Sequence, residues 1–160
     1  MSDLTIRAAE RADAALILRF VQELAVYEEA ADEVVATEAT VEQSLFDDGA
    51  RAFAFICEDA GTPVGFAVCF YSYSTWLARN GLYLEDLYVT PQARGRGAGK
   101  ALLQYLARLA VDQGCGRFEW SVLDWNTPAI EFYEAAGARP QSEWTTYRLA
   151  GDALERFAGH

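Results

Sequence analysis

Residues 94–100 form a basic, glycine-rich segment, RGRGAGK, between two apolar runs. The run before it, residues 82–89, is typical of a buried strand, and residues 101–111 carry apolar side chains at helical spacing. Glycines at alternate positions let backbone N–H groups turn toward one point, and the helix N-terminus behind them adds partial positive charge. The segment therefore requires a strand–turn–helix unit and predicts a site for a phosphate-bearing ligand.

This glycine pattern differs from two common nucleotide-binding motifs. Gly95, Gly97 and Gly99 alternate, whereas the dinucleotide fingerprint needs a G-x-G-x-x-G spacing. A P-loop needs Ser or Thr after its Gly-Lys pair, and here Lys100 is followed by Ala101. A flexible surface turn is the alternative interpretation of the segment.

Strand-like and helix-like patterns are interleaved along the whole chain. Besides 82–89, strands are expected over residues 4–8, 52–58, 64–73, 117–122 and 144–149. Helices are expected over residues 13–28, 40–46, 101–111, 127–136 and 151–157, with Asp13 and Thr127 as N-caps. This order predicts a single mixed α/β domain over residues 1–160.

Composition and charge exclude several classes of function. Hydrophobic residues make up 52% of the 160, yet no run is long enough to cross a bilayer and the N-terminus lacks a signal-peptide pattern, so a cytoplasmic protein is expected. The net charge of −11 argues against binding to nucleic acid or anionic membrane. The chain has one histidine, the last residue His160, which argues against Ser–His–Asp catalysis and against a histidine metal site. The three cysteines are expected to be buried free thiols.

The charges are unevenly distributed. Residues 20–50 contain nine Asp or Glu and no Lys or Arg, whereas residues 87–111 contain Arg and Lys but no acid. The first segment would tolerate a cation and the second an anion; a merely solvated acidic face is the alternative for the first.

Two adjacent carboxylates, Glu85 and Asp86, interrupt the apolar strand 82–89. Strand alternation predicts that Asp86 shares a face with Leu84 and Tyr88, and that Glu85 points to the opposite face. A half-buried carboxylate has a raised pKa, which suits a general base; an ion-paired strand carboxylate is the alternative.

Near the C-terminus, Asn126, Ile130 and Tyr133 are spaced by four and three residues, so they share one helix face. Asn126 can donate to a ligand, and Tyr133 places a phenol beside it. A tyrosine packed in the core is the alternative.

Together these three elements resemble the GNAT superfamily of acyl-CoA-dependent N-acetyltransferases. Residues 94–99 look like its pyrophosphate loop, and residues 126–137 look like its second CoA-contacting helix. The closest likeness is to the diamine acetyltransferase branch, which acts on spermidine, spermine or thialysine. That likeness is carried by residues 23–28, 64–67, Trp76, 83–86 and 125–128.

The resemblance implies a GNAT fold, with a central, mostly antiparallel sheet, a splayed parallel pair and flanking helices. It also implies acetyl-CoA as co-substrate without a metal, a small amine as acceptor, a homodimer and direct transfer in a ternary complex. Tyr133 would be the general acid and Glu85 the base. Cofactor contacts would come from Leu87, Tyr88, Val89, Arg94, Gly95, Arg96, Gly97, Ala98, Gly99, Lys100, Asn126 and Ala129. Substrate contacts would come from Tyr27, Glu28, Trp76, Glu85, Glu119, Trp120, Ser121 and Glu143.

The sequence departs from the polyamine-specific members at two positions. Val26 replaces a basic residue, and Ser74 replaces an acid. The sequence therefore supports a lysine-like amino acid or another small primary amine as the acceptor as well as it supports a polyamine. A protein or peptide N-acetyltransferase and a non-catalytic acyl-CoA-binding module are the alternatives.

Overall fold

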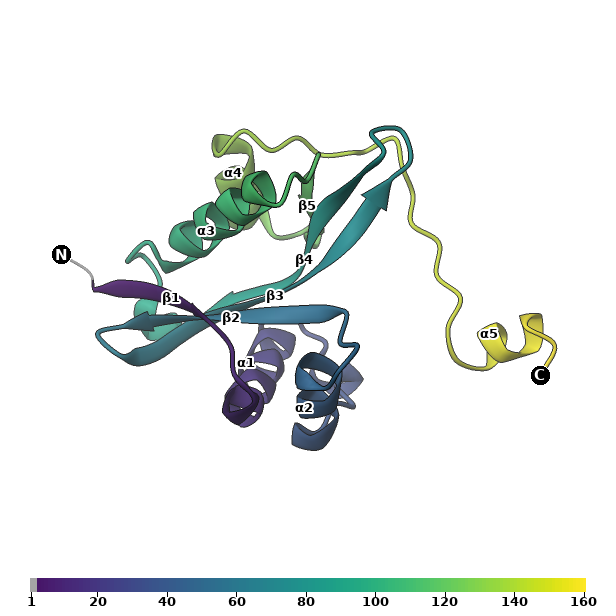
Figure 1. Ribbon diagram of the computed structural model, residues 1–160, viewed down its shortest axis with the longest axis horizontal. Helices are drawn as coiled ribbons and strands as arrows, with labels where there is room; N and C mark the ends of the chain where they lie inside the picture. The colour runs from purple at the N-terminus through teal and green to yellow at the C-terminus, as the bar shows by residue number, and fades with distance from the viewer. Residues whose placement is uncertain (1–2) are drawn as a thin grey trace. The chain divides into compact units, whose positions relative to one another are not determined.

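The computed structural model describes residues 3–160, which form two compact units, one ending at Ser121 and one beginning at Val122. The first unit is a five-stranded sheet in the order β1-β2-β3-β4-β5 (Figure 1). The first four strands pair antiparallel with their neighbours, and β5 pairs parallel with β4. The strands are β1 (Leu4–Ala8), β2 (Ala52–Asp59), β3 (Thr62–Ser74), β4 (Arg79–Val89) and β5 (Phe118–Trp120). This mixed sheet confirms the expected fold class.

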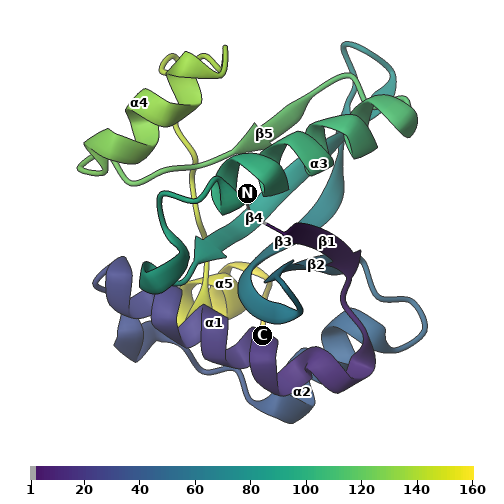
Figure 2. The same cartoon turned by 90° about the vertical axis from the view of Figure 1, so that its left-hand side faces the viewer.

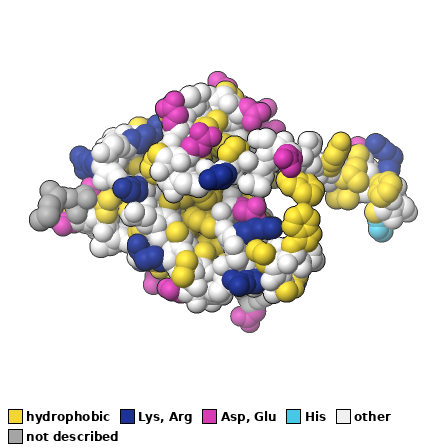
Figure 3. Space-filling view, turned by 90° about the horizontal axis from the view of Figure 1, so that it is seen from above, with side chains coloured by type: hydrophobic (Ala, Val, Ile, Leu, Met, Phe, Trp, Pro, Cys, Tyr) yellow, Lys and Arg dark blue, Asp and Glu magenta, His cyan; other side chains and the backbone are white. Residues whose placement is uncertain are grey.

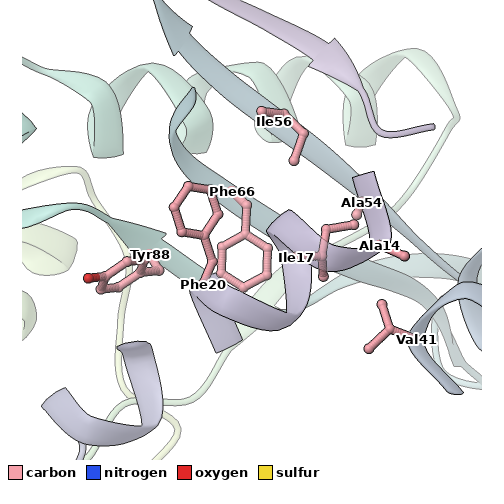
Figure 4. Close-up of a cluster of buried hydrophobic side chains, with 8 residues drawn as sticks. All are labelled: Ala14, Ile17, Phe20, Val41, Ala54, Ile56, Phe66 and Tyr88. Carbon is pink, nitrogen blue, oxygen red and sulfur yellow. The ribbon is translucent and has the colours of Figure 1, made fainter. Parts of the chain in front are cut away.

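Helices cover both faces of this sheet (Figures 1 and 2). Helices α1 (Ala14–Tyr27) and α2 (Glu38–Phe46) lie on one face, and α3 (Ala98–Asp112) lies on the other. Short 3-10 turns occupy Arg11–Asp13, Ala31–Glu33 and Pro91–Ala93. On the α1 side, Phe20 packs against Phe66 and Tyr88, with ring centroids 5.5 and 5.8 Å away (Figure 4). On the α3 side, Leu102 and Leu106 are fully buried.

A β-bulge in β4 overturns the predicted side-chain alternation. Leu84 pairs with Cys69 but Asp86 pairs with Val68, so Glu85 is the extra residue on its strand. Paired residues share a face, and a one-residue insertion shifts every later side chain to the other face. Asp86 therefore lies on the α1 side with Tyr88, whereas Leu84 lies on the α3 side.

One of the two predicted helix caps needs correction. Asp13 is the N-cap residue of α1, as predicted, but its carboxylate accepts hydrogen bonds from Arg7 (2.7 and 3.0 Å) and from the Glu10 N–H and none from the first turn of that helix. The Arg7 guanidinium lowers the pKa of Asp13. In the second unit, Asn126 rather than Thr127 is the N-cap of α4 (Thr127–Ala135), because its Oδ1 accepts from the Ala129 N–H at 3.4 Å. An amide oxygen serves this role as well as a hydroxyl does.

The second unit contains α4 and a short terminal helix, α5 (Gly151–Phe157). The strand predicted over residues 144–149 does not form: within residues 122–160 no segment is a strand. A strand is held by hydrogen bonds to a neighbour, which apolar alternation cannot supply. Tyr147 is 93% exposed, and Figure 3 shows hydrophobic side chains along this C-terminal segment, at the right of the view.

None of the helices in residues 3–160 combines the length and apolar character needed to cross a bilayer.

Candidate active site

The glycine-rich segment is a turn leading directly into α3. Gly95 and Gly97 have φ values of 83° and 86°, in the left-handed region that favours glycine. Helix α3 begins at Ala98, three residues earlier than predicted, and its first hydrogen bond runs from the Ala101 N–H to the Gly97 carbonyl (2.9 Å). The N–H groups of residues 98–100 thus belong to the first turn, where backbone donors lack a helical acceptor. This arrangement is suited to an anion.

The space around these glycines is open. A Cβ atom built on Gly95 or Gly97 would meet no heavy atom within 4 Å. One built on Gly99 would lie at ordinary contact distance from Val89 Cγ2 (3.9 Å) and Leu87 Cδ2 (4.0 Å). The structure therefore brings Leu87 and Val89, both predicted ligand contacts, beside the first turn of α3.

The three cations of the segment have different surroundings. The Arg96 Nη1 is 3.0 Å from Asp59 Oδ2, at the turn between β2 and β3. The Arg94 Nε donates to the Val89 carbonyl (3.1 Å), and its guanidinium lies over the Tyr27 and Tyr88 rings. Lys100 is exposed on the first turn of α3.

Two carboxylates act on a third, Asp86, near the bulge of β4. Burial, together with the charges of Glu85 and Glu28, raises the pKa of Asp86 to about 6. Burial also raises the pKa of Glu28, at the C-terminal end of α1. Glu85 is exposed. The sequence analysis chose Glu85 and did not include Asp86 among the predicted site residues. The available signal was a second acid in the same apolar strand. The bulge that turns Asp86 toward α1 could not be read from the sequence.

Other predicted substrate residues are spread along the first unit. Glu119 and Trp120 pair with Tyr83 and Leu84, and Ser121 Oγ is 2.8 Å from the Tyr83 hydroxyl, so this strand lies beside the bulge. Trp76 instead occupies the tip of the β3–β4 hairpin and is 78% exposed. Strand rise places this tip roughly 20 Å from Glu85 along β4. The structure does not bring Trp76 to the carboxylates.

The second unit carries the remaining predicted residues. Asn126 is buried at the N-terminus of α4, and its side chain already accepts from the Ala129 N–H. Tyr133 is half-buried two turns later, with its ring 5.9 Å from that of Phe132. Glu143 lies beyond α4 and is exposed.

Metal ligands were not predicted, and among residues 3–160 no group of three or more His, Cys, Asp or Glu side chains is arranged to hold a metal ion.

Comparison with known proteins identifies relatives of the chain. Residues 19–138 match the acetyltransferase (GNAT) family. The chain is 36% identical to the thialysine N-epsilon-acetyltransferase of Sus scrofa over an alignment 170 positions long, which covers 99% of both chains. It is 47% identical over 91 residues to the L-ornithine N5-acetyltransferase of Arabidopsis thaliana, covering 57% of this chain and 40% of that protein. An integron cassette protein from the mobile metagenome of V. cholerae has a TM-score of 0.81 at 25% identity, with 98% of each chain covered.

Proposed function

Because the chain belongs to the GNAT family and is an N-acetyltransferase, we propose that it transfers the acetyl group of acetyl-CoA to a primary amine of a small molecule. One observation carries the proposal: strand β4 contains the carboxylates Glu85 and Asp86, and the chain continues from its end into the turn of α3, which is suited to an anion. A site that holds an anionic donor at one end and attracts a cationic acceptor nearby fits this reaction.

The residues of the turn fit the pyrophosphate of CoA. The first-turn N–H groups of Ala98, Gly99 and Lys100, the open glycines and the cations Arg96 and Lys100 would bind it. Leu87, Tyr88 and Val89, at the end of β4, would contact the pantetheine chain, and the family likeness adds Asn126 and Ala129. Acetyl-CoA supplies the acetyl group as a thioester, and CoA leaves as a thiol.

The acceptor amine must lose a proton before it can attack. Glu85 would accept that proton, directly or through water, while Asp86 and Glu28 hold the incoming ammonium group. Tyr133 would donate a proton to the departing CoA sulfur. Tyr133 is assigned by its place in the family pattern, and no covalent acyl-enzyme is needed.

A diamine or a lysine-like amino acid is the proposed acceptor. The relatives' names point to this class, and an acidic site suits a second cationic group on the acceptor. The surrounding contacts would come from Tyr27, Glu119, Trp120 and Ser121, and the family likeness adds Glu143. The single domain over residues 1–160, the homodimer and the cytoplasmic location remain predictions.

Release of CoA thiol from acetyl-CoA, with L-thialysine or L-ornithine as acceptor, tests this function. The expected result is amine-dependent release and, in Tyr133→Phe, a kcat lowered roughly tenfold or more with little change in acetyl-CoA affinity. Binding of acetyl-CoA with no turnover of any amine would instead identify a non-catalytic acyl-CoA-binding module.

A further inference from the structure

Arg94 connects the turn of α3 to two aromatic rings on other elements. Its Nε donates to the Val89 carbonyl at 3.1 Å, which fixes the guanidinium at the end of β4. The guanidinium carbon lies 5.2 Å from the centroid of the Tyr27 ring and 5.8 Å from that of the Tyr88 ring. Both distances are within the range of a cation–π interaction.

The two rings differ in how far they are exposed. Tyr88 is 5% exposed and packs on Phe20, and its hydroxyl donates to Glu23 Oε1 at 2.8 Å. Figure 4 shows that hydroxyl directed away from the buried cluster. Tyr27, by contrast, is the last residue of α1 and is 41% exposed. Arg94 therefore uses a fixed ring, Tyr88, as a support from which it contacts an exposed one.

Tyr27 is adjacent in the sequence to one of the three carboxylates near the bulge of β4. The next residue, Glu28, is the C-cap of α1, and its charge acts on Asp86 of β4. A displacement of Tyr27 would move the backbone that carries Glu28. Arg94, at the turn of α3, thus contacts Tyr27, and the backbone continues from Tyr27 to Glu28, whose charge acts on the carboxylate of Asp86.

We infer that Arg94 is a positioning residue that couples the two substrate sites: by holding Tyr27, and with it Glu28, it makes CoA binding at the turn strengthen amine binding at the carboxylates. This inference rests on the proposed function. Arg94 precedes Gly95 and Gly97, whose left-handed conformations shape the turn, so a ligand that orders the turn also orders Arg94. The coupling is reciprocal: the amine must strengthen CoA binding by the same factor.

The test is a thermodynamic cycle measured by calorimetry. The dissociation constant of L-thialysine is measured with and without saturating CoA, which cannot donate an acetyl group. Their ratio is expected to be about five or more in the unaltered protein, a typical size for coupling between sites. In Arg94→Lys the ratio is expected to fall to about one, because Lys keeps the charge but loses the planar fork that stacks on a ring.

Arg96→Lys is the matched control, since it makes the same change in the same turn at an arginine that pairs with Asp59. It is expected to keep the coupling ratio. At the other end of the contact, Tyr27→Leu should lose the coupling and Tyr27→Phe should retain it, since Phe keeps the ring that the Arg94 guanidinium contacts. A role of Arg94 in stability alone would lower the melting temperature and leave the ratio intact.

Two results would overturn the inference while the proposed function stands: a ratio of one in the unaltered protein that still acetylates the amine, or an Arg94→Lys protein that loses CoA affinity and keeps the ratio. The second result would make Arg94 a phosphate ligand. Failure of the unaltered protein to bind CoA or to acetylate any amine would overturn both.

Discussion

Asp86 shows how one inserted residue decides the chemistry of a strand. Glu85 and Asp86 are adjacent acids in an apolar run, and alternation alone places Asp86 beside Leu84. The bulge at Glu85 instead turns Asp86 toward α1, where burial and the charges of Glu85 and Glu28 raise its pKa to about 6. A bulge depends on pairing with a neighbouring strand, so the local pattern could predict the strand and the acids but not which acid is buried.

The pH dependence of turnover should report Asp86. It is neutral below its pKa and negatively charged above it, so kcat/KM for the amine should rise with pH through about 6, as the free enzyme gains the charge that attracts the ammonium group. Asp86→Asn should remove this rise.

Glu85→Gln is the control for Asp86→Asn, because it removes one neighbouring negative charge and leaves Asp86 in place. Because Glu85 raises the pKa of Asp86, the rise should remain but shift to lower pH, with lower overall activity. A rise near pH 6 that survives in Asp86→Asn would contradict the assignment.

A substitution at Gly99 can test contact with the ligand without disturbing the fold. A Cβ there meets only ordinary contacts, and Gly99 is a helical residue without a left-handed φ, so Gly99→Ala should leave stability unchanged or raise it by up to about 1 kcal/mol. If CoA lies against this turn, the added methyl group should weaken CoA binding about tenfold or more, measured by calorimetry. Unchanged affinity in the folded variant would remove Gly99 from the binding site.

At the scale of elements, the end of α1 contains a locally unfavourable residue. The Ala30 N–H donates to the Ala25 carbonyl (2.8 Å) and the Glu29 N–H to the Val26 carbonyl (3.1 Å), a helix ending in which glycine is usual at the left-handed position. Glu29 occupies that position with a φ of 61°. Strain of this kind is found beside functional sites, and here it adjoins Glu28.

Glu29→Gly should therefore raise the free energy of unfolding by about 1 kcal/mol, measured by denaturant titration. Glu29→Ala is the control: it removes the same charge but keeps the Cβ atom, so it should give little of this gain. An equal gain in both variants would show that charge, and not backbone strain, is the cause.

The turn of α3 is linked to the β2–β3 hairpin by the Arg96–Asp59 ion pair. Asp59 pairs with Arg96, a cation that the proposed pyrophosphate site needs. Asp59→Asn should therefore tighten CoA binding a few-fold, because the Arg96 guanidinium no longer pairs with a carboxylate and can bind phosphate oxygens instead. Glu58→Gln removes a neighbouring charge that pairs with Arg7, and should have a smaller effect. Weaker CoA binding in Asp59→Asn would mean that Asp59 orients Arg96 for the ligand.

The elements themselves were largely predictable, and each departure of the structure from the predicted elements has a physical cause. Residues 4–8 form the expected strand, and the helix after the glycines starts early because Gly97 supplies the first acceptor. Residues 144–149 have strand-like alternation but no strand partner within residues 122–160. Periodicity predicts which face a segment would bury, whereas pairing depends on residues distant in the sequence.

At the scale of the whole molecule, the fold belongs to a family with many acceptors, and the fold alone does not choose among them. The turn proposed as the donor site is predictable from the sequence, because glycine spacing determines its backbone geometry. The proposed acceptor site depends on the positions of a few carboxylates, and the environment of Asp86 became apparent only from strand pairing.

The most direct test of the central claim is a competition for one limiting supply of acetyl-CoA. L-thialysine, L-ornithine, spermidine and a basic peptide are mixed at equal concentration with the protein, and the acetylated products are measured by mass spectrometry. We predict that an N-acetylated small amine accumulates first, with the peptide unmodified until the small amines are consumed. Predominant acetylation of the peptide would contradict the account and identify a protein or peptide N-acetyltransferase.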